Sequence, residues 1–232
     1  MSFIRRWISA LVTLLFPNLC LACNTELYAG EHLLCSRCRY SLPYTDHHLF
    51  ADNRVNRQLW GRIPSPNAMA LLHFRKGGSV QQIMHQIKYH HQTALGAMLG
   101  SMAAEKLAAS SQYQDIDLLI PVPLHWKRLR TRGYNQSECI AQGIAAYLQV
   151  PLDTNHLIRH SATSSQTRKN RYQRYENMKS VFAICDETAL KDKHILLVDD
   201  VITTGATIEA CALELHRCGI RKLSIFALAF AD

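Results

Sequence analysis

The chain has 232 residues, of which 48% are apolar and 19% are charged. This balance is that of a folded globular protein and excludes a low-complexity or disordered chain. The length allows one large domain or a core with a small appendage. The formal net charge of +8 favours an anionic partner, either a polyphosphate or a nucleic acid, and charge alone does not choose between them.

The first segment has the outline of a signal peptide, because Arg5 and Arg6 precede an apolar run from Trp7 to Phe16. However, Pro17 ends the run, no small-x-small cleavage site follows, and the run is too short to cross a bilayer. We therefore expect an amphipathic helix over 3–16 that packs on the protein body or on a partner, with a signal anchor as the alternative. No membrane span is expected, and the predicted location is the cytoplasm.

Two C-x-x-C pairs follow, Cys20 with Cys23 and Cys35 with Cys38, and eleven residues separate them. Two such pairs can aim four thiolates at one point and complete a closed tetrahedral zinc site. A lobe of roughly 40 residues buries too little apolar surface to hold itself together, so the predicted role of the zinc is structural. Two disulfides are the alternative, and a reducing cytoplasm disfavours them.

The other cysteines and the paired histidines are expected to have no role as ligands. Cysteines outside the two pairs are scattered, and we expect them to be reduced core residues; they are Cys139, Cys185, Cys211 and Cys218. Adjacent histidines rarely converge on one metal, so the pairs His47–His48 and His90–His91 are expected at the solvated surface.

The rest of the chain alternates predicted strands and helices. A polar connector over 46–66 precedes a strand over 68–74 and a turn at 76–78. Apolar residues then recur at helical spacing over 80–87 and 95–107. A strand over 117–123, a basic loop over 124–136 and a helix over 137–148 come next. Later, a strand ending in two acids, a threonine-rich loop, a helix stopped by Gly219 and a strand over 222–230 follow. This order predicts a parallel α/β sheet with both loops at its carboxyl edge.

The stretch 195–207 is the most informative part of the sequence. Four apolar residues lead into Asp199 and Asp200, which is typical of a buried parallel strand whose carboxyl end faces a ligand. The loop that follows would present unpaired N–H groups and hydroxyl donors to a phosphate at a helix N-terminus; its residues are Thr203, Thr204, Gly205, Ala206 and Thr207. The two carboxylates suit ribose hydroxyls or a magnesium shell. Together they predict a sugar-phosphate site.

Two other interpretations compete with this one. Adjacent acids also end a strand in phospho-acceptor receiver domains, but there the pair lies on the first strand, and only 32 residues follow Asp200. The second is an ordinary buried strand and turn with solvated acids. No Walker-type or G-x-G-x-x-G run is present, so a nucleotide triphosphatase or a dinucleotide-binding fold gains no support.

The stretch resembles the phosphoribosyl-pyrophosphate (PRPP) signature of type I phosphoribosyltransferases. The resemblance implies a parallel-sheet α/β phosphoribosyltransferase fold over 67–232, with a small N-terminal zinc-binding lobe over 1–45. It also implies that Asp199 and Asp200 hold the ribose hydroxyls of PRPP, while residues 203–207 hold its 5-phosphate.

The run Pro121-Val-Pro-Leu, the run Arg132-Gly-Tyr-Asn-Gln136 and the two C-x-x-C pairs together resemble the ComF family of late-competence proteins. Such proteins combine a zinc lobe with a phosphoribosyltransferase-like domain. The segment from Gln166 to Phe182 is similar to that family's mobile loop, which implies roles for Gln166, Arg171, Arg174 and Asn177. Many relatives carry further cysteine pairs after position 40, which this chain lacks, so a second zinc is not expected.

The implied reaction displaces pyrophosphate from the anomeric carbon of PRPP, with magnesium bridging pyrophosphate and ribose oxygens. Lys127, Arg128 and Arg132 are the candidates for contacts with pyrophosphate, and a mobile segment over 163–178 would close over the site. The alternative for that segment is a solvated cationic surface loop. No part of the sequence indicates an acceptor substrate.

A second hypothesis is that the domain is a non-catalytic single-stranded DNA-binding competence factor, working with other competence proteins. Arginines and lysines would supply charge and tyrosines would stack on bases; they are Arg130, Arg132, Arg168, Lys169, Arg171, Arg174, Tyr134, Tyr172 and Tyr175. A PRPP sensor that controls a partner lies between the two hypotheses. The same residues serve each of them, so the sequence does not separate them.

Overall fold

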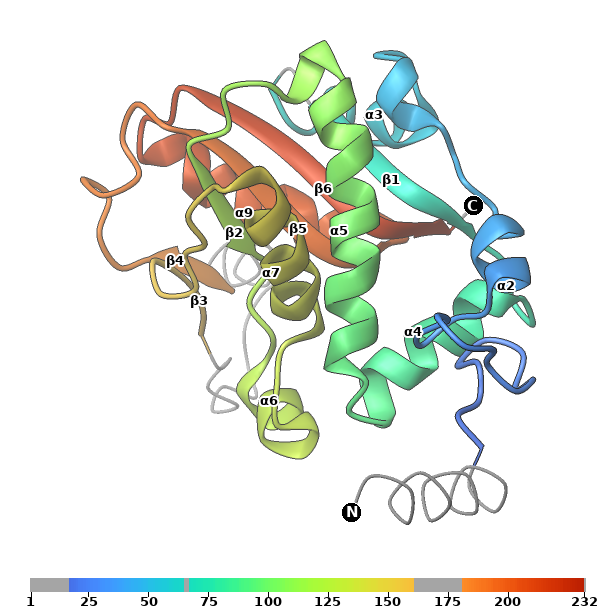
Figure 1. Ribbon diagram of the computed structural model, residues 1–232. Coiled ribbons are helices and arrows are strands. Elements are labelled where there is room, and N and C mark those ends of the chain that lie inside the picture. Colours follow the sequence, from blue (N-terminus) through green and yellow to red (C-terminus); the bar gives the residue numbers. More distant parts are fainter. Residues whose placement is uncertain (1–16, 65–66, 161–180, 232) are drawn as a thin grey trace.

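The computed structural model describes residues 17–64, 67–160 and 181–231 (Figure 1). Its main sheet has four parallel strands in the order β1-β6-β5-β2, which are Asn67–Phe74, Lys222–Ala231, His194–Ile202 and Leu118–Pro121. The central strands are continuous runs of buried apolar residues, as expected where helices cover both faces of a sheet. The predicted parallel α/β fold is confirmed.

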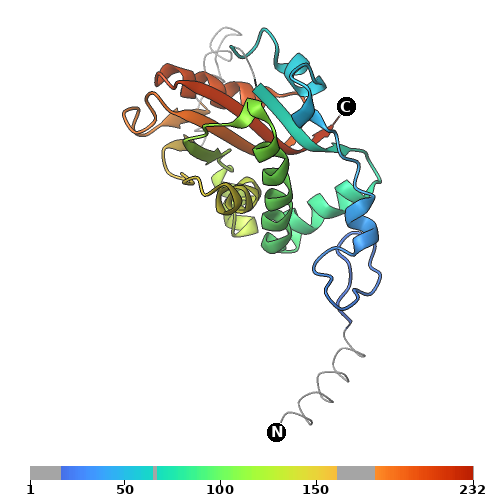
Figure 2. The ribbon, with the colours of Figure 1, turned by 45° about the horizontal axis from the view of Figure 1, so that its top comes forward.

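Helices cover both faces of this sheet (Figures 1 and 2). On one face lie α4 (Ser79–Tyr89), α5 (Thr93–Ala109) and α7 (Gln136–Leu148), whose apolar residues share a core with alternate residues of the strands. The other face is covered by α3 (Arg54–Leu59) and α9 (Ala206–Arg217), which form a second core. Gly219 follows α9 with a φ of 70°, so the predicted glycine stop is confirmed.

Smaller elements complete the described chain. The cysteine lobe carries α2 (Ser36–Tyr40) and packs beside the N-terminal end of α4 (Figure 1). A separate antiparallel pair is formed by β3 (Leu157–Arg159) and β4 (Phe182–Ile184). The 3-10 turns η1 (His47–Leu49) and η2 (Ser111–Tyr113) and the helix α6 (Trp126–Arg132) make up the rest. No helix of the described residues is long and apolar enough to cross a membrane.

Three local expectations were wrong. The basic segment 124–136 is not a loop throughout, because His125 caps the N-terminus of α6 and Gly133, with a φ of 79°, ends it. His47 and His48 are buried rather than solvated, since η1 packs against β1, whereas His90 and His91 are exposed as expected. Of the four scattered cysteines, Cys185 is exposed, and the other three are buried.

The range 46–66 contributes to the fold as well as to the chain connection. Asn53 caps α3 by accepting a hydrogen bond from the Asn56 backbone N–H at 3.0 Å, and it donates to the Ala68 carbonyl at 2.8 Å. Val55 and Leu59 of this short helix are fully buried against the sheet. Asn53, one of the polar residues of the predicted connector, is therefore the cap of a helix whose apolar face belongs to the core.

Glycines allow α5 and α7 to cross at very short range. A Cβ atom on Gly100 would lie 2.1 Å from the Ile140 carbonyl oxygen, and one on Gly143 would lie 1.9 Å from the Ala97 carbonyl oxygen. Any side chain at either position would therefore force the helix backbones apart. This crossing fixes the position of α7, whose first turn reaches the carboxyl end of β5.

We expect Gly143→Ala to lower the free energy of unfolding by about 2 kcal/mol or more, although alanine is the better helix former by about 1 kcal/mol. The clash with the Ala97 backbone outweighs the gain in helix propensity. Denaturant unfolding measures the change, with Gln142→Ala, an exposed position on the same helix, as the control. A Gly143→Ala protein as stable as the wild type would contradict the close crossing.

Candidate functional site

The carboxyl end of β5 places Asp199 in a buried position. Only 9% of its surface is exposed, and its Oδ1 atom accepts hydrogen bonds from Ser137 Oγ at 3.1 Å and from the Asp200 backbone N–H at 2.8 Å. Burial and the neighbouring charge of Asp200 raise the pKa of Asp199 to about 7, against the effect of those hydrogen bonds. Asp199 is therefore a carboxyl group that changes its charge near neutral pH.

Asp200 has a cationic partner instead. Its Oδ2 atom lies 2.9 Å from the Lys88 ammonium at the end of α4, and both side chains are largely shielded from water. The pair of acids is thus asymmetric: one is buried and hydrogen-bonded, while the other is neutralised by a lysine from another element. Among the described residues, Ser137 supplies a side-chain contact to Asp199, and Lys88 supplies one to Asp200.

The loop after β5 presents the start of α9 to solvent. Thr203, Thr204, Ala206 and Thr207 are exposed, whereas Gly205 is buried at the N-cap of α9 with a φ of 75°. The N-cap residue Gly205 has no side chain to cap this helix, and the Ala206 N–H donates only a long hydrogen bond of 3.5 Å to Thr204 Oγ1. The first turn of α9 can therefore still donate hydrogen bonds to an anion. The five residues predicted to bind phosphate therefore form one helix-opening turn directly after Asp199 and Asp200.

The carbonyl side of the same loop is held by α3 and the residues after it. Gln58 Nε2 donates to the Thr203 carbonyl, and an Arg62 guanidinium nitrogen donates to the Thr204 carbonyl at 2.6 Å. Arg62 also pairs with Glu209 of α9 at 2.9 Å. These contacts occupy two carbonyl oxygens of the loop, which would otherwise repel an anion.

Gly205 is required at this loop for a steric reason. A Cβ atom there would lie 2.8 Å from Leu59 Cδ2 and 3.3 Å from an Arg62 guanidinium nitrogen. The positive φ adds backbone strain for any other residue. The loop and α3 are therefore packed together too closely for a side chain between them.

The predicted pyrophosphate contacts lie on α6, beside a pocket of about 390 Å³. Cationic and aromatic side chains line it: Lys88, Tyr89, His91, Lys127, Arg128, Thr131, Arg132 and Tyr134. The structure thus brings Lys127, Arg128 and Arg132 together and connects them to Asp200 through Lys88. No described acid lines this pocket, so it is suited to an anion.

The turn between α6 and α7 is fixed by its own polar residues. Asn135 donates to the Val122 carbonyl at 2.9 Å and caps α7 by accepting from the Ser137 backbone N–H at 3.1 Å. The Tyr134 hydroxyl donates to the Ile87 carbonyl, and its ring lies 5.6 Å from that of His91. Tyr134 is therefore a half-buried structural residue rather than a free stacking surface.

Several predicted site residues lie outside the described residues. They belong to the proposed mobile segment 163–178 and to the single-stranded DNA hypothesis: Gln166, Arg168, Lys169, Arg171, Tyr172, Arg174, Tyr175 and Asn177. The predicted N-terminal helix over 3–16 lies outside them too. Phe182, at the end of the family-like segment, is buried in β4.

The four N-terminal cysteines converge as predicted. The sulfur atoms of Cys20, Cys23, Cys35 and Cys38 all lie within 4.8 Å of one another, and Cys23 Sγ is 3.7 Å from Cys35 Sγ. A tetrahedral zinc site with bonds of about 2.3 Å requires sulfur atoms about 3.8 Å apart, so the four thiols fit zinc. All eight cysteines lie in the described chain, and none forms a disulfide.

The backbone and a threonine support the same cluster. The Cys35 backbone N–H donates to Cys20 Sγ at 3.3 Å, and the Cys38 backbone N–H donates to Cys35 Sγ at 3.4 Å. Hydrogen bonds with Thr25 lower the pKa of Cys23 to about 6, whereas burial raises the pKa of Cys38. Donors aimed at sulfur favour thiolates, which are the form that binds a metal.

Four residues of the site had no sequence signal strong enough to identify them. They come from three helices and from the turn after α3, and they reach residues 199–209 only through the tertiary fold; they are Gln58, Arg62, Lys88 and Ser137. Ser137 follows the Arg132–Gln136 run directly, and Lys88 ends a helix, but neither position carries a local pattern that indicates a contact with β5.

Comparison with known proteins gives two results. The model of the family described as "Phosphoribosyl transferase domain" matches residues 135–231. The chain is also 27% identical over 224 residues to competence protein F of Haemophilus influenzae, covering 91% of this chain and 96% of that protein. It is 25% identical over 228 residues to the DNA utilization protein YhgH of Escherichia coli K12, with the same coverage of 91% and 96%.

Among solved structures, the chain is similar to the glutamine PRPP amidotransferase from B. subtilis, complexed with ADP and GMP. The sequence identity is 16%, the TM-score is 0.46, and the match covers 63% of this chain and 30% of that one.

We expect Cys35→Ser to abolish stoichiometric zinc binding and to expose residues 17–45 to proteolysis, because a structural zinc contributes on the order of 10 kcal/mol to such a lobe. Metal content by mass spectrometry and limited proteolysis measure the two effects. Cys185→Ser, which changes an exposed cysteine outside the cluster, is the control. A wild-type protein purified without zinc, or a Cys35→Ser protein that keeps it, would contradict this assignment.

Proposed function

We propose, on the premise that this chain is a homologue of competence protein F with a phosphoribosyltransferase-type domain, that it binds PRPP together with magnesium and transfers the phosphoribosyl group. The observation that carries the proposal is the position of Asp199 and Asp200. They lie directly before a loop whose carbonyls are held by Gln58 and Arg62 and whose open side presents the N-terminus of α9.

Each part of PRPP has a matching set of groups in this arrangement. The 5-phosphate would accept hydrogen bonds from the N–H groups and hydroxyls of residues 203–207. The ribose hydroxyls would lie against Asp199 and Asp200. The pyrophosphate would face α6, where Lys127, Arg128 and Arg132 supply positive charge beside Lys88.

Magnesium would fit the same set of donors. It prefers hard oxygen ligands, and it is commonly held by one or two carboxylates together with phosphate oxygens of the substrate. When bound, it would neutralise charge on the departing pyrophosphate. Lys88 lies between Asp200 and the α6 pocket, so its ammonium can move from the carboxylate towards the pyrophosphate once the cation arrives.

A second function, binding of single-stranded DNA, is favoured by the surface of α6 and the end of α4. Trp126 is 47% exposed with the Lys127 ammonium 5.6 Å from its ring centre, and Tyr89 is 59% exposed with the Arg132 guanidinium 5.1 Å from its ring centre. Exposed rings beside cations are what stacking on bases requires. The name of the Escherichia coli relative, DNA utilization protein YhgH, agrees with this hypothesis.

We expect magnesium and PRPP at millimolar concentration to raise the melting temperature of the wild-type protein, because a ligand that binds only the folded state stabilises it. Asp200→Asn should remove this rise in melting temperature, since the neutral amide cannot balance the charge of magnesium. Asp192→Asn, an exposed change at the opposite edge of the sheet, should keep it. If the wild type shows no shift, the chain does not bind PRPP.

The affinity for magnesium and PRPP should also rise with pH. Asp199 is largely protonated below its pKa of about 7, so each pH unit below that value should weaken binding by up to about tenfold. Calorimetric titrations from about pH 5.5 to about pH 8 measure this slope. An affinity that does not change with pH would show that the carboxylate of Asp199 takes no part in binding magnesium and PRPP.

The stability of the unliganded protein should fall, rather than rise, as the pH increases. The folded state raises the pKa of Asp199 above its unfolded value, so the unfolded chain releases that proton first and the contribution of Asp199 to stability falls as pH rises from about 4 to about 7. Asp199→Asn should therefore raise the melting temperature at pH 8 and have little effect at pH 4. Equal shifts at both pH values would count against a buried, titrating carboxyl.

We expect Trp126→Ala to weaken single-stranded DNA binding by about tenfold, since base stacking on one ring contributes about 1–3 kcal/mol. Fluorescence anisotropy with a labelled oligonucleotide measures the affinity, and repeating it at several salt concentrations gives the number of phosphate contacts. Tyr147→Ala is the control, because Tyr147 is a similarly exposed ring, 48% exposed, on a different helix, α7. Salt-independent binding, or an equal loss of affinity in both variants, would contradict this second function.

A further inference from the structure

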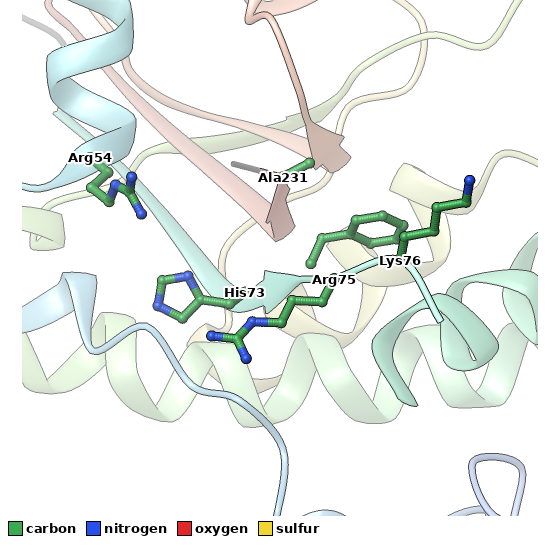
Figure 3. A pocket seen from close by; sticks show the side chains of 6 residues that line it. Arg54, His73, Arg75, Lys76 and Ala231 are labelled. Atoms are coloured by element: carbon green, nitrogen blue, oxygen red, sulfur yellow. The ribbon is translucent and has the colours of Figure 1, made fainter. Parts of the chain in front are cut away.

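A second pocket, of about 480 Å³, lies at the carboxyl ends of β1 and β6 (Figure 3). Six residues line it: Arg54, His73, Phe74, Arg75, Lys76 and Ala231. His73, Arg75 and Lys76 carry nitrogen groups that can bind an anion, and Arg54, which has a partner of its own, also lines the pocket. The site described above does not include any of these residues.

The cationic groups come from two elements and surround one space. In Figure 3, His73 lies between Arg54, which comes from α3, and Arg75, which follows β1, while Lys76 extends to the other side. Guanidinium groups can bind a carboxylate or a phosphate through two parallel hydrogen bonds. Phe74 adds an apolar surface, so the pocket suits a small molecule that has both a flat ring and an anionic group.

This pocket is next to the loop that would hold the 5-phosphate. Arg54 and Gln58 are four residues apart on α3, which places them on the same face of the helix with Cβ atoms about 6 Å apart. Gln58 contacts Thr203 while Arg54 lines the pocket. In the sheet, β6 alone separates β5 from β1, so the pocket lies about 5–10 Å from the end of β5.

The order of the strands puts this pocket and the α6 pocket on opposite sides of Asp199 and Asp200. α6 follows β2, which pairs with β5 on one side, whereas β6 and β1 lie on the other. In a displacement at the anomeric carbon, the nucleophile approaches opposite the leaving group, with the reacting atoms aligned. If pyrophosphate leaves towards α6, the acceptor enters from the side of β6 and β1.

We propose that this pocket is the acceptor subsite and that the acceptor is a small ring compound carrying a carboxylate or a phosphate group. This inference rests on the proposed function. A nucleophilic N–H or O–H group of the acceptor would form the new bond to the anomeric carbon as the bond from that carbon to the pyrophosphate oxygen breaks. Pyrophosphate leaves with the electron pair, and the acceptor group releases its proton to water. The guanidinium of Arg75 holds the anionic group and so orients the ring.

The experiment measures binding of matched probes by calorimetry to the full chain, in magnesium and saturating ribose 5-phosphate, so that the phosphate loop is filled. Uracil-6-carboxylate and phenyl phosphate are the anionic probes, and uracil is the neutral one. The proteins are the wild type, Arg75→Ala and Lys191→Ala, the last being an exposed cation at the amino edge of the sheet. We expect at least one anionic probe to bind more tightly than uracil, and Arg75→Ala to weaken it about tenfold.

The probes and variants separate the outcomes. Preference for uracil-6-carboxylate assigns the pocket to a carboxylate, and preference for phenyl phosphate assigns it to a phosphate ester. If neither anion binds better than uracil, or if Arg75→Ala and Lys191→Ala bind the anionic probes with the same affinity, the assignment of this pocket as the acceptor subsite is wrong. A separate titration with magnesium and PRPP should give the same affinity for the wild type and Arg75→Ala. Failure of PRPP to bind the wild type overturns the proposed function, whereas the probe titrations still decide whether the pocket holds anions.

Discussion

The burial of one carboxylate, Asp199, sets the requirements that the surrounding structure meets. A buried carboxyl group must have hydrogen-bond donors in fixed positions, or its burial costs several kcal/mol. Ser137 is one donor, and it is placed by the α7 cap at Asn135 and by the close crossing of α5 and α7. The glycines at that crossing, Gly100 and Gly143, therefore help to determine where the hydroxyl of Ser137 lies.

The carboxyl edge of the sheet is divided by charge. Acids occupy the end of the central strand β5, and cations lie on either side, on α6 beyond β2 and around the end of β1. Between them, α3 joins one cationic pocket to the back of the threonine loop. A short helix of six residues thus contacts both the loop and a pocket, and its residue Leu59 lies too close to Gly205 for a side chain there.

The elements that were predictable from sequence are those whose pattern is local. The apolar strands, the helical spacing of Val80 to Ile87, the glycine after α9 and the two C-x-x-C pairs each carry their own signal within a few residues. The misjudged segments are those whose environment is set by distant residues. His47 looked like a surface residue because nothing near it in the sequence reveals that η1 packs on β1, and Gln58 and Arg62 looked like connector residues because their partners lie about 145 positions later.

The ion pair between Lys88 and Asp200 has a consequence for the order in which ligands assemble. A free divalent cation meets a carboxylate whose charge is already balanced, next to a second carboxyl that is half protonated near neutral pH. Such a site has little attraction for a bare metal ion. A metal that arrives already chelated by a polyphosphate brings its own counter-charge, and it gives the lysine a new anion to contact. If the proposed function is correct, the unliganded protein would bind free metal ions weakly, and the metal would enter the site together with the polyphosphate.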